Sequence, residues 1–165
     1  MTRLHGWSLK GERIEEYVPD VRFERTSIMA VIGINGYIAP MTYKNTLDGD
    51  LFKAYVEQLL INELEEGDIL ILDNLSVHKK NNNEALQPLI DKGIKIVWLP
   101  PYSSDLNPIE LSWSKLKSII RKHKPRTTEE LMDVLNFALD EITQEDIINW
   151  FKHDGYFFYP PCSNV

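Results

Sequence analysis

The chain has 165 residues, of which 43% are hydrophobic and 26% are charged, close to the average of globular proteins. This length suits one domain, residues 1–165, and nothing in it calls for a second core. The formal net charge of −7 argues against a protein that binds nucleic acid over its whole surface, because affinity for phosphate normally comes from Lys and Arg.

Export and disulfide chemistry are also excluded. No stretch of about 18 uncharged apolar residues occurs, and residues 1–7 contain no apolar signal region. The only cysteine, Cys162, can form neither an intrachain disulfide nor a thiolate zinc cluster. We therefore expect a cytoplasmic protein without a membrane partner.

The first half of the chain predicts a hairpin, a helix and a strand. Residues 1–25 are polar and mixed in charge, and we expect them to be irregular. The β-branched run 28–34, the Asn35-Gly36 pair and the run 37–43 predict an antiparallel hairpin. Apolar residues at helical spacing follow from Asp50, and this helix is expected to end at Gly67.

The next segments complete a sheet with helices on it. The apolar run 68–73 predicts a strand, and residues 81–92 predict a helix that Pro88 fits poorly. After Gly93, residues 94–99 predict a further strand. Strands joined through helices pair in parallel. The predicted fold class is therefore α/β, a mixed sheet of an antiparallel hairpin plus parallel strands with flanking helices.

The last third of the chain reads as helical. The Asn107-Pro108 pair predicts the start of a helix that runs to about Lys122. Residues 126–165 predict a helical C-terminal extension, which a capping box from Thr127 to Glu130 opens. A further short helix is expected from about Thr143.

Two carboxylates stand in well-marked contexts, Asp73 at the end of an apolar run and Glu110 at the end of the segment 99–110. An ionised Asp at the end of a buried strand costs free energy unless a cation meets it. A second carboxylate nearby adds repulsion unless divalent ions lie between the two. Both acids fall where strands end and helices begin, which indicates a metal-dependent phosphoryl-transfer site. Such sites usually use three or more acids.

Each acid also has a purely structural explanation. Asp73 could cap a turn at the strand end. Glu110 could close an Asn-x-x-Glu variant of the capping box with Asn107. Capping does not require the stiff loop that precedes Asn107, however. Asp105 is best explained as a turn residue, and Trp98 and Trp113 as core residues.

Basic residues gather directly after Glu110. Six of the 18 Lys and Arg residues lie between Lys115 and Arg126, and they are either a solvated helix face or a phosphate-contacting patch. His78 and Lys79, after Asp73, are further candidates for such contacts, although a satisfied surface histidine is the common alternative. The candidate phosphate contacts are His78, Lys79, Lys115, Lys117, Arg121 and Lys122.

At this point the residues resemble a known family. The segments 72–79 and 99–110, with Trp113 and Lys117 behind them, and the segment 6–13 resemble the Asp-Asp-Glu (DDE) transposases of bacterial insertion sequences related to mariner elements. The resemblance implies an RNase H-like fold. It makes Asp73 the second catalytic Asp and Glu110 the third acid, both catalytic and both ligands of Mg²⁺ or Mn²⁺. The implied DNA partners are transposon ends and target.

The resemblance also implies a missing part. In the family the first catalytic Asp lies on the first strand of the sheet, before the Gly-Trp segment, whereas Trp7 here is the seventh residue. We therefore expect the first strand and its Asp to be absent, and Asp20, Asp48 and Asp50 are poor substitutes because loop formation and helix capping explain them. An exposed strand edge would then favour self-association, or pairing with an upstream transposase segment or full-length transposase.

Three functions remain open. The first is a transposase catalytic domain that cleaves DNA strands and transfers them, incomplete on its own. The second is a non-catalytic transposase remnant that acts by associating with DNA or protein. The third is a generic RNase H-like nuclease.

Overall fold

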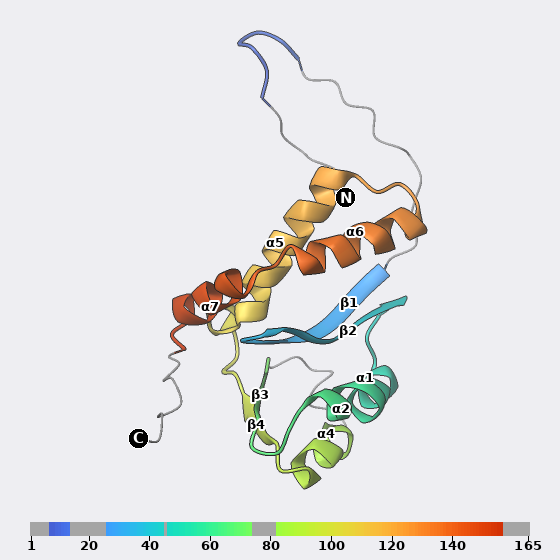
Figure 1. The fold of residues 1–165 in the computed structure, drawn as a ribbon, viewed down its shortest axis with the longest axis vertical. Helices are drawn as coiled ribbons and strands as arrows, with labels where there is room; N and C mark the ends of the chain where they lie inside the picture. Colours follow the sequence, from blue (N-terminus) through green and yellow to red (C-terminus); the bar gives the residue numbers. More distant parts are fainter. Residues whose placement is uncertain (1–6, 14–25, 45, 74–81, 157–165) are drawn as a thin grey trace.

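The computed structural model describes residues 7–13, 26–44, 46–73 and 82–156 (Figure 1). The regular elements, in chain order, are β1 (Thr26–Gly33), β2 (Gly36–Lys44), α1 (Gly49–Tyr55), the π-helix η1 (Val56–Leu60), α2 (Ile61–Glu63), β3 (Ile69–Leu72), α4 (Asn82–Asp91), β4 (Lys95–Trp98), the 3₁₀-helix η2 (Ser104–Leu106), α5 (Pro108–His123), α6 (Thr128–Asp140) and α7 (Gln144–His153). Residues 7–13 contain a turn but no helix or strand.

The predicted hairpin is confirmed, with a shift at its turn. Strands β1 and β2 pair antiparallel, and Gly33 faces Gly36 at the closed end, so that Ile34 and Asn35 form the turn in place of the expected Asn35-Gly36 pair. Gly36 is the first residue of β2, just after the turn. Its φ of +140° is one that only glycine adopts readily. The pairing register shifts between Met29 and Val31.

The first helical segment starts as expected but ends early. Asp48 caps α1 by accepting a hydrogen bond from the backbone N–H of Leu51 at 2.9 Å, which confirms its capping role. Helices α1, η1 and α2 follow one another without a break, and Leu64 then adopts extended backbone and is buried. The helix thus ends at Glu63 and not at Gly67, which has a φ of +94° before β3.

The second predicted strand–helix–strand unit is also present. Strands β3 and β4 pair in parallel, from Ile69 opposite Lys95 to Leu72 opposite Trp98. Helix α4 connects them and continues through Pro88. Gly93, with a φ of +87°, ends the turn after α4 as expected. Trp98 is 40% exposed, so its prediction as a core residue was wrong.

The predicted sheet is divided in two. The hairpin of β1 and β2 is one two-stranded sheet, and the parallel pair of β3 and β4 is another. In the described part of the chain, no ladder joins the two. The predicted components of the mixed α/β fold are therefore all present, but the strands do not form one continuous sheet.

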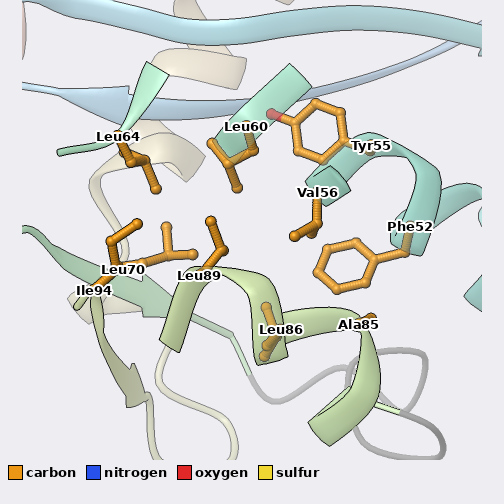
Figure 2. Close-up of a cluster of buried hydrophobic side chains, with 10 residues drawn as sticks. All are labelled: Phe52, Tyr55, Val56, Leu60, Leu64, Leu70, Ala85, Leu86, Leu89 and Ile94. Atoms are coloured by element: carbon orange, nitrogen blue, oxygen red, sulfur yellow. The ribbon is translucent and has the colours of Figure 1, made fainter. Parts of the chain in front are cut away.

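Two apolar clusters lie on either side of the hairpin, which is the middle layer (Figure 1). The first cluster, in Figure 2, joins α1, η1, α4 and β3 and receives Met29 and Val31 of β1. The second joins α5, α6 and α7 and receives Ile28 and Ile32 of the same strand. Because neighbouring side chains of a strand point to opposite faces, β1 serves both clusters.

The capping box predicted from Thr127 to Glu130 is present. At the start of α6 the Thr127 hydroxyl accepts a hydrogen bond from the backbone N–H of Glu130, and the Glu130 carboxylate accepts one from the backbone N–H of Thr127. Thr143 and Asp146 form a second capping box at the start of α7. None of the helices in the described residues is long and apolar enough to cross a membrane, and the cytoplasmic location stays a prediction.

Candidate metal centre

Asp73 follows directly on the last residue of β3. That strand is held by its parallel ladder with β4, and the backbone N–H of Leu99 extends the ladder by donating to the carbonyl of Leu72 at 2.8 Å. Asp73 is half-buried, and its Oδ1 atom is buried. The position of this carboxylate is thus fixed by the sheet.

Glu110 lies in the first turn of α5. The chain reaches it from β4 through the loop that contains η2, and the Glu110 N–H donates to the carbonyl of Asn107 at 3.0 Å. The Asn107 side chain makes no capping bond, so the Asn-x-x-Glu box, the structural alternative for Glu110, is not formed. Glu110 is exposed. A carboxylate at this helix end is also favoured by the helix dipole.

Helix α5 is fixed against the hairpin by aromatic and polar contacts. The Trp113 and Tyr37 rings stack with centroids 5.8 Å apart. Ser112 is fully buried, and its hydroxyl donates to the Ile109 carbonyl at 2.6 Å. Burial raises the pKa of Tyr37. These contacts set the start of α5, and Glu110 with it.

Asp73 and Glu110 line the same two cavities. The first, of about 330 Å³, lies between the two sheets, and the second, of about 480 Å³, lies under the loop before α5. Asp73, Asn107 and Glu110 line both. Carboxylate oxygens are the donors that Mg²⁺ and Mn²⁺ prefer, so the donor chemistry fits a hard divalent ion.

The described residues supply two acids to this site and no more. No group of three His, Cys, Asp or Glu side chains suited to a metal ion occurs among them. Asp105 is exposed in η2 and lines neither cavity. Asp48 is a helix cap, and Asp20 lies outside the described residues.

The predicted phosphate-contacting residues differ in their surroundings. Lys117, Arg121 and Lys122 are exposed on α5. Lys115 instead donates to Asp146 of α7 at 2.5 Å. His78 and Lys79 lie outside the described residues. The ion pair of Lys115 with Asp146 joins residues far apart in the sequence, and no local pattern indicates it.

Another long-range contact supports the loop before α5. The Tyr156 hydroxyl donates to the Leu106 carbonyl of η2 at 2.8 Å, and Tyr156 also lines the first cavity. Its ring packs edge-on against Phe151, with centroids 5.5 Å apart. The residues just after α7 thus contact and support the segment that leads to Glu110. No local sequence pattern indicates this contact across 50 residues.

Solved structures of Mos1 transposase assemblies share this fold. They include a strand transfer complex (17% identity, TM-score 0.70), a paired-end complex with the left transposon end (17%, 0.71) and a pre-cleavage transpososome (14%, 0.69). Each match covers 96% of this chain and 51%, 52% and 53% of the respective Mos1 chain, so this chain spans about half their length. The likeness shows the RNase H-like fold that the sequence predicts.

Sequence comparison identifies the family. No curated protein sequence matches the chain significantly. The family model described as DDE superfamily endonuclease matches residues 1–132, which is most of the chain and includes both Asp73 and Glu110. The chain therefore belongs to the DDE superfamily endonucleases.

Proposed function

We propose that this chain is the catalytic part of a transposase, which cleaves DNA strands at transposon ends and joins them to a target. The observation that carries the proposal is the convergence of Asp73 and Glu110, from two different elements, on the same two cavities in a DDE superfamily endonuclease. The Mos1 structures, in which this fold is assembled with a transposon end or in a strand transfer complex, support DNA as the partner.

Asp73 and Glu110 are proposed to hold Mg²⁺ or Mn²⁺. When bound, such an ion would polarise the phosphodiester and activate the attacking oxygen. Asp73 would provide a fixed ligand and Glu110 a more mobile one, because the first is half-buried and the second is exposed. A third carboxylate would come from polypeptide outside the described residues.

DNA would follow the exposed face of α5 that starts at Glu110. Glu110, Lys117 and Arg121 are all exposed, and their spacing of seven and four residues puts them on one side of the helix. We call these three residues the α5 stripe. With a rise of 1.5 Å per residue, Arg121 lies about 16 Å along the helix axis from Glu110. Lys115 is engaged with Asp146, and we propose a structural role for it. His78 and Lys79 stay predicted contacts.

Metal titration tests the site directly. We expect Mn²⁺ binding, measured by calorimetry on the purified chain, to weaken at least tenfold in Asp73→Asn and in Glu110→Gln. Asp105→Asn, which removes an exposed acid outside both cavities, should bind Mn²⁺ like the natural chain. Equal affinity in all four proteins would overturn the assignment.

DNA assays distinguish the functions that share this fold. A catalytic transposase part, supplied with its missing polypeptide, should cut transposon-end DNA and join the free 3′-hydroxyl to a second duplex. A generic nuclease would cut without joining. A remnant that acts by association would do neither and would change the activity of full-length transposase when added to it.

A further inference from the structure

Tyr102, in the loop between β4 and η2, has a backbone conformation that tyrosine rarely adopts. Its φ is +61°, in the left-handed region, which is unfavourable for a bulky side chain. Two other non-glycine residues of the described chain have a positive φ, and each has a local cause. Lys124 is the C-cap of α5, and Ala39 lies where the register of the hairpin shifts. Tyr102 belongs to no helix or strand, so its strain has no such explanation.

The Tyr102 side chain is also fully exposed. Its ring therefore adds nothing to the apolar core, and contact of a whole aromatic ring with water is unfavourable. Strained residues persist only where the surrounding structure holds them in place, and they concentrate at ligand sites. A tyrosine that is unfavourable in both backbone and solvation is thus better explained by a ligand than by folding.

The loop that carries Tyr102 is stiff. Pro100 and Pro101 come directly before it, and each proline ring fixes its own φ. After Tyr102, the hydrogen bond from the Tyr156 hydroxyl to the Leu106 carbonyl holds η2 at 2.8 Å. The Tyr102 backbone is therefore held from both sides before any ligand binds, which lowers the entropy that a ligand loses on binding.

Tyr102 lies at the rim of the second cavity, the one under the loop before α5. Its volume of about 480 Å³ is within the range of small-ligand sites. The polar and aromatic residues of its lining are Asp73, Tyr102, Ser103, Ser104, Asn107 and Glu110. Neither Ser103 nor Asn107 uses its side chain to cap a helix, so a hydroxyl and an amide are available to a ligand.

The charges of this cavity restrict what it accepts. Among the described residues, its lining includes two acids and no Lys or Arg. An anionic group would enter only beside a divalent ion held by Asp73 and Glu110. A flat, neutral, polar ring suits the other end, where the Tyr102 ring offers a face and the Ser and Asn side chains offer hydrogen bonds. A phosphate joined to a heteroaromatic ring, that is a nucleotide, combines both properties.

The nucleotide must be unpaired. Inside a duplex the faces of each base are covered by the neighbouring bases, so a protein ring stacks only on a base that has left the stack or ends a strand. Aromatic side chains hold single-stranded bases in this way, with little preference for sequence. An exposed tyrosine could also anchor a protein partner. That alternative leaves the shared cavity with the two acids unexplained.

We infer that Tyr102 is the stacking platform for one unpaired nucleotide of a DNA strand, whose phosphate lies toward Asp73 and Glu110. That this nucleotide belongs to a strand being cut or joined rests on the proposed function. The role of Tyr102 itself rests on its backbone, its exposure and its cavity.

The test compares two DNA molecules that share one duplex, one blunt and one with a short unpaired 3′ end. The first unpaired base is 2-aminopurine, whose fluorescence falls when it stacks on an aromatic ring. With Mn²⁺ present, we expect the purified chain to bind the unpaired end about tenfold more tightly than the blunt end, the size expected for one stacked base, and to quench the fluorescence. Equal affinities or unchanged fluorescence would overturn the inference.

Substitutions separate stacking from a structural role. Tyr102→Phe and Tyr102→Trp should keep the preference for the unpaired end. Tyr102→Asn should lose both the preference and the quenching while its thermal stability stays equal or rises, because Asn tolerates the left-handed region. Trp7→Leu, which removes a fully exposed ring outside both cavities, is the control and should bind like the natural chain.

Three outcomes for these variants would overturn the role of Tyr102. The first is a Tyr102→Asn chain that keeps the preference, and the second is one that unfolds at lower temperature. The third is self-association of the natural chain, seen by light scattering, that Tyr102→Asn abolishes, since Tyr102 would then be a protein contact.

Mn²⁺ calorimetry without DNA keeps the two proposals apart. If Mn²⁺ binds but the unpaired end is not preferred, the stacking platform fails and the metal site stands. If Mn²⁺ does not bind while a Tyr102-dependent preference is present, the proposed metal site fails and the platform stands.

Discussion

The Asp73 and Glu110 carboxylates line the same two cavities, and two like charges there repel each other in the absence of a cation. A bound divalent ion should therefore stabilise the fold. Mn²⁺ at about 100 times its dissociation constant should raise the free energy of unfolding by about 2.7 kcal/mol. In Asp73→Asn this gain should largely disappear. Urea unfolding with Mn²⁺ or with a chelator measures both effects, and an equal gain in the variant would speak against Asp73 as a ligand.

The Lys115–Asp146 pair links α5 to the start of α7 and makes stability depend on pH. Partial burial alone would raise the pKa of Asp146, but hydrogen bonds from Lys115 and Thr143 outweigh it and hold the pKa below its ordinary value of 3.8. A carboxyl whose pKa is lowered in the folded state stabilises the fold at pH values above its unfolded-state pKa. This contribution is lost as the pH falls through its folded-state pKa.

The Asp146 carboxyl should make the natural chain more sensitive to acid than the Asp146→Asn variant. Between about pH 6 and pH 3, the natural chain should lose about 1 kcal/mol more stability than Asp146→Asn, since the pair is partly exposed and worth little more. Urea unfolding at several pH values measures the difference. Parallel pH profiles would show that the pair contributes nothing. Glu145→Gln, which alters an exposed acid one residue earlier, provides the control.

At the scale of elements, α5 combines an acid and two bases on one exposed stripe. We expect Lys117→Ala and Arg121→Ala each to weaken binding to duplex DNA and to lower the slope of log K against log salt by about 0.9, the value for one phosphate contact. Lys122 lies roughly 120° around the helix from Glu110, so Lys122→Ala should have a smaller effect. Fluorescence anisotropy across a salt series measures the affinity and the slope. Identical slopes for all three variants would contradict DNA binding along the exposed face of α5 that carries Lys117 and Arg121.

The turn between α4 and β4 depends on Gly93. Its φ is +87°, and a Cβ there would lie 2.8 Å from Cγ of Glu66, whereas a Cβ at Gly67 (φ +94°) would meet nothing within 4 Å. Gly67→Ala should thus cost about 1–2 kcal/mol from backbone strain alone. Gly93→Ala should cost more, and Glu66→Ala in the same chain should remove the excess. Thermal unfolding of the natural chain and the three variants tests this, and equal costs at both glycines would contradict it.

Local patterns in the sequence predicted much of these elements, and contacts between distant residues were missed. Alternating and helical apolar spacing, Gly93 and the Thr127 cap are local signals, and they gave the strands, the helices and most of their ends. The positions of Asp73 and Glu110 at element ends were readable in the same way. Lys115 pairs with Asp146 across 31 residues and Tyr156 reaches Leu106 across 50, and such contacts depend on packing between helices.

The π-helix and the divided sheet had no local signal either. Five residues of η1 bond one position further along than in an α-helix, yet their apolar spacing still reads as helical. Periodicity also says nothing about which strand edges meet. The division of the described strands into two sheets therefore became visible only in three dimensions.

At the scale of the molecule, the hairpin is shared by two apolar clusters, and the prediction of one domain depends on it. Val31 packs on the α1–α4 cluster and the adjacent Ile32 on the α5–α7 cluster. In a single cooperative unit, a loss on either face lowers the stability of the whole molecule. In two units, each loss would stay within its own cluster.

Val31→Ala and Ile32→Ala form a matched pair for this question. Each should lower the free energy of unfolding by about 1–3 kcal/mol, because both side chains are partly buried. Native-state hydrogen exchange then compares the most protected amides of α4 with those of α6. In one domain, each variant should lower the exchange free energy of both helices equally. If Val31→Ala affected α4 alone and Ile32→Ala affected α6 alone, the two clusters would unfold independently, and the hairpin would connect two domains where the sequence predicts one.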